Sequence, residues 1–327
     1  MSLLTVRNLS VAFPTQNGWF QAVEGIYLDV NAGDVLAIVG ESGSGKSVAM
    51  MAVMNLLPPT ARVTCDELKL DGQDLLAMPA KQRRQLNGGT VAMIFQEPMS
   101  SLNPCFTIGY QIDETIRIHL GGSKKERTER VLYLLEIVGI PDPARRYKAY
   151  PHQMSGGMSQ RAMIAMALAA NPKLLIADEP TTALDVTVQA QILELLLKLQ
   201  QTQGMGLILI THDMGVVAET AQQVVVQYAG QQVEKQPVKG LFNTPHHPYT
   251  AALLDALPER APAGDFLPTI QGIVPGQKDR PSGCLFSPRC THAQAKCHAQ
   301  QPALQRDSDT WLRCYYPLNL GAELTHG

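Results

Sequence analysis

Several residue types are scarce in this sequence of 327 residues, and each scarcity excludes a class of protein. Aromatic residues make up only 6%, which argues against a surface that stacks nucleic-acid bases. The 27 Lys and Arg residues do not outnumber the 29 Asp and Glu residues, so there is no basic surplus to neutralise a phosphate backbone. No apolar run approaches the roughly 18–20 residues of a membrane span, and residues 1–8 lack the apolar core of a signal peptide. We expect a cytosolic protein that binds no nucleic acid and reaches a membrane only through partners.

Cysteine is scarce as well, with six residues in the chain. The cytosol keeps thiols reduced, which argues against a framework of disulfides. The remaining composition, with 45% hydrophobic and 17% charged residues, is that of an ordinary globular protein. The length fits one large domain or two moderate ones.

Short apolar runs alternate with helical patterns over most of the chain. These runs are apolar on both faces, as in strands that are buried between helices. The expected strands are Val35–Val39, Val91–Phe95, Leu174–Ala177, Leu207–Ile210 and Val224–Val226. Helices are expected at Ser47–Leu57 and Gln189–Gln200, and the stretch Gln111–Gly139 is typical of a helical subdomain inserted between strands. The alternation predicts an α/β fold with a largely parallel sheet.

The texture of the sequence changes after Leu257. Pro258, Pro262, Gly264 and Pro268 interrupt regular structure and predict a linker there. We therefore expect a main domain over residues 1–257, with its helical subdomain at about 100–170, and a small Cys-rich, loop-like extension over residues 258–327.

The segment Gly40–Ser47, with the sequence GESGSGKS, fits the phosphate-loop (Walker A) pattern in full. It follows an expected strand and opens an expected helix, so its backbone N–H groups and the helix N-terminus can bind phosphate oxygens. Lys46 is expected to reach the β- and γ-phosphates, and Ser47 to offer its hydroxyl to Mg²⁺. The expected ATP-binding residues of this loop are Gly40, Glu41, Ser42, Gly43, Ser44, Gly45, Lys46 and Ser47.

Two carboxylates end the apolar strand near residue 177. Asp178 stands where a Walker B acid would hold Mg²⁺. Glu179 follows it on the opposite side of an extended backbone and suits a general base for the water that attacks the γ-phosphate. Alone, the two could be solvated charges at a strand end, but the phosphate loop upstream favours the catalytic interpretation.

A third motif narrows the family. Ser155 can cap a helix over Gly156–Ala170, and its hydroxyl, the glycine N–H groups and the helix dipole would form a second phosphate site. Two chains that face each other head to tail have a use for such a site, whereas a single chain has none that is obvious. The segment Met154–Arg161 resembles the signature motif of ATP-binding cassette (ABC) proteins, although Met158 and Ser159 depart from its usual residues.

Other positions extend this resemblance in the expected order. It implies that Gln96 senses nucleotide and helps Ser47 and Asp178 to hold Mg²⁺, and that His212 contacts the γ-phosphate. Together with Glu179, Gln96 and His212 make up the expected catalytic set.

The resemblance also implies contacts with the adenine and with the ATP of a partner subunit. Phe13 is similar in placement to the aromatic residue that stacks on adenine, with Phe20 as the less favoured candidate. The segment Ala183–Asp185 is similar to the D-loop. The residues implied to serve the partner's ATP are Ser155, Gly156, Gly157 and Asp185.

Later motifs resemble the ATPase subunits of bacterial oligopeptide and dipeptide importers. They are Ser101–Pro104, His246–Thr250, Gly272–Gly276 and Cys284–Cys290. The implied fold is a P-loop NTPase of the ABC nucleotide-binding type with an inserted helical subdomain and a C-terminal extension. The implied function is ATP hydrolysis that powers import of dipeptides or short peptides, while oligopeptides, nickel, glutathione or haem remain alternative cargoes.

The family implies an assembly at the cytoplasmic face of the bacterial inner membrane. Its other members are a second ATPase subunit, often a different chain, two transmembrane permease subunits and an extracytoplasmic peptide-binding protein. A soluble ABC ATPase of DNA repair or translation is the alternative, but such proteins usually carry a second cassette or a long coiled coil, and neither is present. A small-molecule kinase would leave Ser155–Gly157 and Glu179 unexplained.

Four cysteines gather near the C-terminus, namely Cys284, Cys290, Cys297 and Cys314. Their gaps match none of the short metal-binding patterns. Three interpretations stay open: free thiols or one disulfide, a zinc site in which His292 or His298 could replace one thiolate, and a [4Fe–4S] cluster. We favour the cluster, since some dipeptide-importer ATPases are thought to carry one here and a segment poor in large apolar residues gains stability from a metal.

Overall fold

The computed structural model describes residues 2–182, 185–258 and 268–319, and it divides into two compact units. The first unit comprises Met1–Leu4, Val30–Asp34 and Lys69–Ile210. The second comprises Thr5–Asp29, Val35–Leu68 and Thr211–Gly327. The units are described one after the other.

A parallel sheet forms the centre of the first unit. It consists of β7 (Val91–Ile94), β8 (Leu174–Asp178) and β9 (Gly206–Ile210), all buried along their whole length. β8 pairs in parallel with β7 and β9, as the two-sided apolar runs predict. The helix α8 (Val186–Gln203) connects β8 to β9 and includes the predicted helix Gln189–Gln200.

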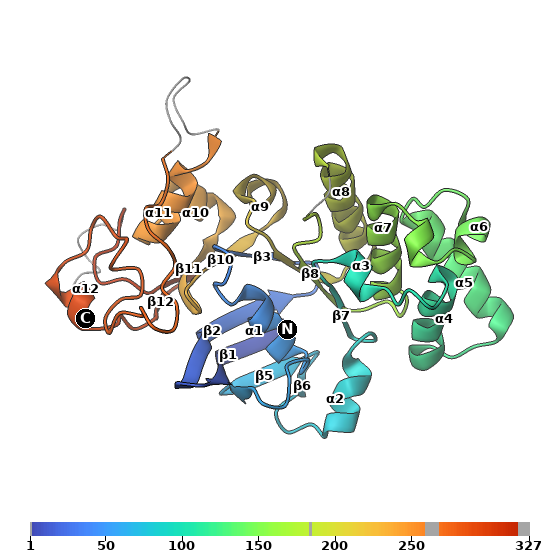
Figure 1. The fold of residues 1–327 in the computed structure, drawn as a ribbon, viewed down its shortest axis with the longest axis horizontal. Helices are drawn as coiled ribbons and strands as arrows, with labels where there is room; N and C mark the ends of the chain where they lie inside the picture. Colours follow the sequence, from blue (N-terminus) through green and yellow to red (C-terminus); the bar gives the residue numbers. More distant parts are fainter. Residues whose placement is uncertain (1, 183–184, 259–267, 320–327) are drawn as a thin grey trace. The chain divides into compact units, whose positions relative to one another are not determined.

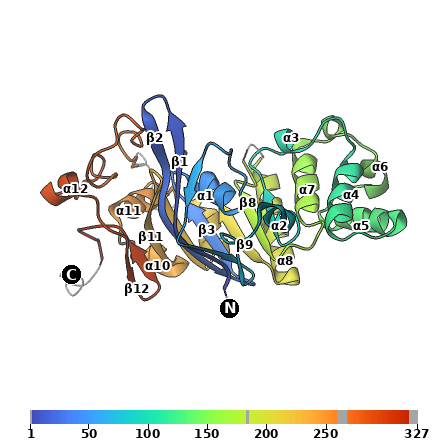
Figure 2. The same ribbon diagram turned by 90° about the horizontal axis from the view of Figure 1, so that it is seen from below.

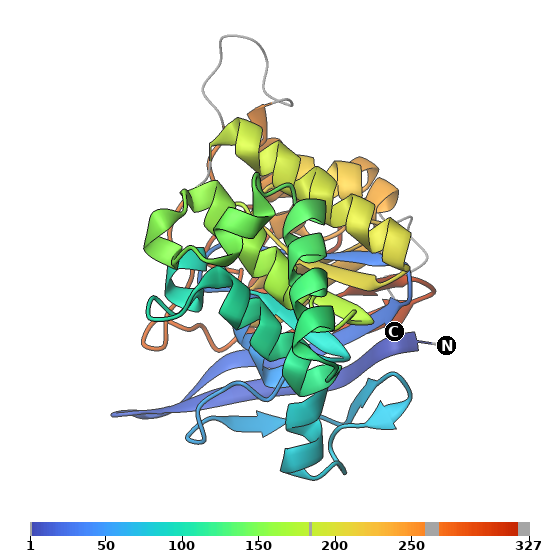
Figure 3. The ribbon, with the colours of Figure 1, turned by 90° about the vertical axis from the view of Figure 1, so that its right-hand side faces the viewer.

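The predicted helical subdomain is present in the first unit. Its helices are α3 (Pro98–Ser101), α4 (Ile108–His119), α5 (Lys124–Ile137), α6 (Pro143–Tyr147) and α7 (Gly156–Ala167), with a 3₁₀ turn at Pro151–Gln153. Figure 3 shows α4, α5 and α7 packed together as the green helices. Ile112, Val131 and Ile164 of these helices are buried.

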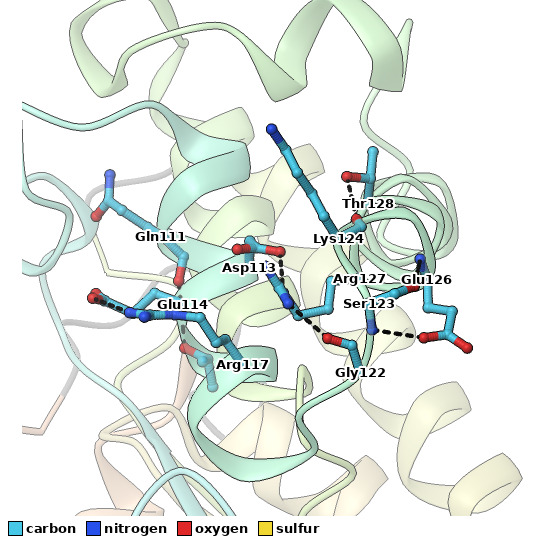
Figure 4. Close-up of polar contacts among 11 residues, drawn as sticks. Gln111, Asp113, Glu114, Arg117, Gly122, Ser123, Lys124, Glu126, Arg127 and Thr128 are labelled. Atoms are coloured by element: carbon cyan, nitrogen blue, oxygen red, sulfur yellow. Dashed lines mark hydrogen bonds and ion pairs between the residues drawn. The ribbon is translucent and has the colours of Figure 1, made fainter.

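Local capping fixes the turn between α4 and α5 (Figure 4). Ser123 caps α5 by accepting a hydrogen bond from the Glu126 N–H, and the Glu126 carboxylate accepts one in return from the Ser123 N–H at 2.7 Å. Arg127 then joins the two helices, since its Nε donates to Asp113 at 2.8 Å and its Nη1 to the Gly122 carbonyl. The subdomain therefore has a defined helix–helix corner.

The central strands of the second unit are β3 (Val35–Val39), β10 (Gln223–Tyr228) and β11 (Gln231–Pro237). β3 and β10 are parallel, while β11 runs antiparallel to β10. The helix α1 (Lys46–Val53) follows β3, and α10 (Val238–Asn243) packs against β10 and β11 (Figure 1). The helices α9 (Met214–Thr220) and α11 (Pro248–Asp255) also belong to this unit.

Two long strands near the N-terminus were not predicted. β1 (Ser2–Thr15) and β2 (Gly18–Asn31) form the blue ribbon of Figure 2. The shorter elements β4 (Arg62–Thr64), β5 (Glu67–Leu70), β6 (Gln73–Asp74) and α2 (Ala80–Leu86) follow. The prediction of a largely parallel sheet holds for the pairs β3–β10, β7–β8 and β8–β9. It is wrong for β11, which is antiparallel to β10, and for β4 and β6, which pair antiparallel with β1 and β5. Their polar residues kept them from forming apolar runs.

The extension has more regular structure than predicted. It contains α12 (Ala295–Ala299), β12 (Gln305–Asp307) and β13 (Thr310–Leu312), and β13 pairs with β11. Phe286 is buried against the rings of Tyr228 and Tyr249, with centroids 5.2 and 5.3 Å apart. The extension, expected to be loop-like, therefore adds both a strand pair and an apolar anchor to the second unit.

The structure also bears on membrane spans. Within residues 2–182, 185–258 and 268–319, no helix combines the length and the apolar character that crossing a bilayer requires.

Candidate functional site

The phosphate loop connects β3 to α1, as predicted. Gly40, Gly43 and Gly45 have φ values of 149°, 78° and 90°, which residues other than glycine rarely adopt. A Cβ on Gly40 would collide with the carbonyl of Gln227, and one on Gly45 would lie 2.7 Å from a carbonyl oxygen on the neighbouring β2. Glycine is therefore required at both ends of the loop by close backbone approach.

Lys46 lies inside the loop. The residue is only 5% exposed, and its ammonium donates hydrogen bonds to the carbonyls of Gly40 at 2.8 Å and Glu41 at 3.1 Å. Ser42 and Gly43 form the exposed tip, and Ser47 is half-buried in the first turn of α1. The loop thus holds a fixed cation among backbone groups at a helix N-terminus, which suits binding of phosphate.

His212 lies next to the start of the loop. It lines a small cavity of about 80 Å³ together with Val39, Gly40 and Glu41. The Thr211 N–H donates to the Ile38 carbonyl at 3.2 Å, which holds the preceding residue beside β3. The structure therefore brings the predicted histidine and the predicted phosphate loop together, although 171 residues separate Glu41 from His212.

Glu41 has partners that the sequence did not indicate. Its carboxylate accepts hydrogen bonds from Arg289 at 2.9 and 3.2 Å, and its N–H donates to the Tyr249 hydroxyl at 3.0 Å. Burial lowers the pKa of Arg289, but hydrogen bonds from it to Glu41 and Tyr228 outweigh burial, so this pKa lies above its ordinary value. No local sequence signal joins residues so far apart.

The two predicted acids stand at the end of β8 in the first unit. Asp178 is buried, and Glu179 has a φ of 45°, a left-handed conformation that costs a residue with a Cβ about 1 kcal/mol or more. The Glu179 carboxylate accepts hydrogen bonds from Gln96 Nε2 at 2.8 Å and Thr182 Oγ1 at 2.9 Å. The structure thus joins the predicted base to the predicted nucleotide-sensing glutamine. Thr182 was missed, because a lone threonine carries no signal.

Ser155 caps α7 as the sequence predicts. It is exposed, and its hydroxyl accepts a hydrogen bond from the Met158 N–H at 3.3 Å. Asp185 caps α8 in the same way, through the Val188 N–H at 3.0 Å. A Cβ built on Gly157 would lie 3.2 Å from Val188 Cγ1, so the first turns of the two capped helices are neighbours. The other D-loop residues, Ala183 and Leu184, lie outside the described residues.

The two aromatic candidates for adenine stacking lie on β1 and β2. Phe13 is half-buried. Phe20 is also half-buried, and the guanidinium of Arg280 lies 5.3 Å from its ring centroid. Phe20 therefore has a cation over its ring, and the adenine role of Phe13 stays a prediction.

The four C-terminal cysteines line one cavity, although their spacing matched no pattern. It measures about 10 Å³, and its other lining residues include His247, His292 and Phe286, but not His298. All four thiols are free of disulfides. Burial raises the pKa of Cys284 and Cys290, and raises that of Cys314 to about 12. We call this the cysteine cavity; within the described part of the chain, no group of three or more His, Cys, Asp or Glu side chains is arranged to hold a metal ion.

Two family models and several curated proteins are similar to this chain. The family model described as ABC transporter matches residues 23–182, and that described as oligopeptide/dipeptide transporter, C-terminal region, matches residues 233–297. The dipeptide transport ATP-binding protein DppD of Escherichia coli is 55% identical over 320 residues, 98% of either chain, and that of Haemophilus influenzae is 54% identical over 319 residues, covering 98% of this chain and 97% of its own.

A solved structure shares the fold. The ATP-binding cassette MJ0796, in a dimeric post-hydrolysis state bound to ADP and Pi, aligns with a TM-score of 0.65 at 26% identity, covering 72% of this chain and 98% of its own.

Proposed function

This chain belongs to the ABC transporter family of peptide-import ATP-binding proteins, and we propose that it hydrolyses ATP to power uptake of dipeptides or other short peptides through a membrane permease. The observation that carries the proposal is the hydrogen-bonded pair of Gln96 and Glu179, which couples a base to a polar sensor at the end of a buried strand. The 55% identity to the dipeptide protein of Escherichia coli supports dipeptides over other cargoes.

The residues present fit Mg²⁺–ATP. The buried ammonium of Lys46, held by backbone carbonyls, is a cation positioned for the β- and γ-phosphates. Ser47, Asp178 and Gln96 carry oxygen atoms, which Mg²⁺ prefers, and in this proposal they would hold the metal. The metal neutralises charge on the phosphates when it is bound. The strained backbone of Glu179 and its two hydrogen-bond donors orient a carboxylate that accepts a proton from the attacking water.

Ser155, Gly156, Gly157 and Asp185 serve the ATP of a second ATPase subunit in this proposal. This role is supported by the exposed start of α7, which Ser155 caps. A helix start of this kind can bind phosphate, and α7 is not the helix that follows the phosphate loop. The cassette MJ0796, bound to ADP and Pi, is dimeric, which supports a pair of ATPase subunits. In this proposal, ATP bound between two subunits closes the dimer and hydrolysis reopens it. The nucleotide thereby drives a conformational change between two states.

The permease subunits dock on the helical subdomain in this proposal. Large apolar side chains there are exposed, among them Met99, Phe106 and Tyr110, and the last two rings stack at 4.8 Å. These residues follow Gln96 closely in the chain, so a docked permease would sense the nucleotide site through a short segment. Such docking places the protein at the cytoplasmic face of the inner membrane, with an extracytoplasmic binding protein delivering the peptide.

We also propose that the cysteine cavity holds a [4Fe–4S] cluster. Four thiols that line one cavity have the chemistry of the donor set that iron–sulfur clusters take, and zinc is the alternative for the same donors. In the described part of the chain these side chains are not arranged as a metal site, so the cluster requires them to converge when it binds. Cys284, Cys290, Cys297 and Cys314 would hold the group. Its role would be structural, because it would cross-link four segments of the extension that are far apart in the sequence.

Reconstitution tests the transport function. The chain is co-expressed with the permease, ATPase and binding-protein subunits of a peptide importer and placed in vesicles. We expect ATP hydrolysis that rises with peptide-loaded binding protein, and uptake of labelled dipeptide. ATPase activity without any association with membrane subunits would instead favour the soluble, non-transport ABC ATPase. Uptake of nickel, glutathione or haem, but not of peptide, would reassign the cargo.

A further inference from the structure

Glu41 places a negative charge in a loop whose ligand is itself strongly negative. It is the second residue of the phosphate loop, and its carbonyl accepts a hydrogen bond from the Lys46 ammonium. Its side chain is 30% exposed, so water screens it only in part. An unpaired carboxylate here would repel the phosphates of ATP.

Arg289, from the extension, pairs with this carboxylate. One nitrogen, Nη1, contacts both oxygens of Glu41, and its side chain is only 5% exposed. Arg289 is 248 positions away in the sequence, so the contact exists only because the extension folds back against the loop. A partly buried charge-assisted hydrogen bond of this kind is stronger than one between neutral groups.

The remaining groups of Arg289 are also held. Its Nε donates to the Gln271 carbonyl at 2.9 Å and its Nη2 to the Ile270 carbonyl at 3.2 Å. Its guanidinium also lies 5.7 Å from the ring centroid of Tyr228, whose hydroxyl is 3.4 Å from Nη1. The guanidinium is therefore fixed in orientation before any ligand arrives.

A second contact from the same side holds the backbone of Glu41. The Tyr249 hydroxyl accepts the Glu41 N–H at 3.0 Å, and Tyr249 is completely buried against Tyr228 and Phe286. Both the backbone and the side chain of Glu41 are thus fixed by residues outside the phosphate-loop motif.

We propose that Arg289 is a positioning residue for ATP binding, which neutralises Glu41 and holds its carboxylate away from the phosphates. This inference rests on the proposed ATPase function and adds a role for the extension in the nucleotide site. In this proposal, Glu41 does not repel the phosphates of ATP as long as Arg289 pairs with its carboxylate.

Equilibrium binding of a fluorescent ATP analogue to the full chain tests the proposal. Arg289→Met should weaken ATP binding on the order of 10-fold, the effect of one poorly screened charge near a bound phosphate. Glu41→Gln should restore most of that affinity in the Arg289→Met background, because the repelling charge is then gone. Arg289→Lys keeps the charge and should lose less. Arg306→Met is the matched control, since Arg306 contacts Ser308 and Trp311 elsewhere in the extension.

Each outcome decides the proposal. Wild-type affinity in Arg289→Met overturns it, and so does weakened binding that Glu41→Gln fails to restore, because that result indicates a general distortion. If Arg289→Met does not fold, the test compares Glu41→Gln with the double variant Glu41→Gln/Arg289→Gln. The two must then bind ATP with the same affinity, because no carboxylate is left to neutralise. A wild-type chain that binds no ATP would refute the proposed function instead, so the two failures are distinguishable.

Discussion

The phosphate loop and the cysteine cavity belong to the same compact unit, but they are built in opposite ways. The loop is eight consecutive residues whose backbone makes the site, and its pattern is complete in the sequence. The cavity takes four cysteines spread over 31 residues, and it forms only when the extension folds. A motif made of contiguous backbone can be recognised by spacing, whereas a site made of converging side chains cannot.

The two regions are nevertheless linked. Arg289, which pairs with Glu41 of the loop, directly precedes Cys290 of the cavity. Substitutions in each region therefore test whether the two regions are independent. The measurements are ATP hydrolysis, ATP affinity, dimer formation and the contents of the cysteine cavity.

The largest effect is expected from Glu179→Gln. It should slow ATP hydrolysis by roughly 10²–10⁴-fold while ATP binding persists, because a positioned base is lost and the metal ligands remain. Single-turnover hydrolysis in the assembled transporter measures this. Glu97→Gln, which changes an exposed carboxylate nearby, is the control. Near-normal turnover would refute the assignment of Glu179 as the general base. ATP hydrolysis at an intact site of the partner ATPase is measured separately and subtracted.

Lys46→Ala tests whether the loop acts alone. Losing the buried ammonium should weaken ATP binding by roughly 10²-fold, as removal of one partner from a buried charged pair does. Isothermal titration with ATP measures the change, and Lys173→Ala, at an exposed lysine paired with Asp71, is the matched control. Unchanged ATP affinity would contradict the phosphate-loop assignment.

Ser155→Arg separates binding from dimer formation. ATP affinity of the isolated chain should persist, while the ATP-dependent dimer should be lost, because the bulky cation replaces a cap that serves the partner's nucleotide. Analytical ultracentrifugation of the Glu179→Gln background with ATP shows the dimer. Ser123→Arg removes an equivalent cap from α5 and controls for helix stability. A normal dimer would refute the head-to-tail arrangement.

The smallest effect on ATP is expected from Cys290→Ser. Protein purified without oxygen should be brown, with about four iron and four sulfide ions per chain, and the variant should lose this colour. The extension should become sensitive to protease, while ATP affinity falls by no more than the order of 10-fold expected for Arg289→Met, since Arg289 is the connection to the loop. Cys105→Ser, at an exposed cysteine outside the cavity, is the control.

Metal analysis of the same samples identifies the occupant of the cavity. One zinc ion per colourless chain would overturn the iron–sulfur interpretation and keep a structural metal. A chain without iron or zinc would overturn both and leave four free thiols.

Much of the central fold could be predicted because strands that are buried on both faces appear in the sequence as short apolar runs. Residues Val35–Val39 are apolar on both faces, and β3 has those same bounds. The helix after Ser155 was expected to reach Ala170 but ends at Ala167, since helix ends carry weaker signals than helix interiors. β1 and β2 were not predicted, because runs that are apolar on both faces mark only fully buried strands. The alternation of buried and polar residues in β1 and β2 is the pattern of a strand with one buried face, and it could have revealed them.

The sequence by itself determined the phosphate loop, the acid pair and the helix start capped by Ser155, because each depends on neighbouring residues and on local hydrogen bonds. Only the tertiary structure decided that Gln96 meets Glu179, that four cysteines share a cavity and that Arg289 neutralises Glu41. Those contacts join residues 83 and 248 positions apart in the two hydrogen-bonded pairs. Chain separation of that size leaves no periodic or spacing signal, so the packing of whole elements has to bring the partners together.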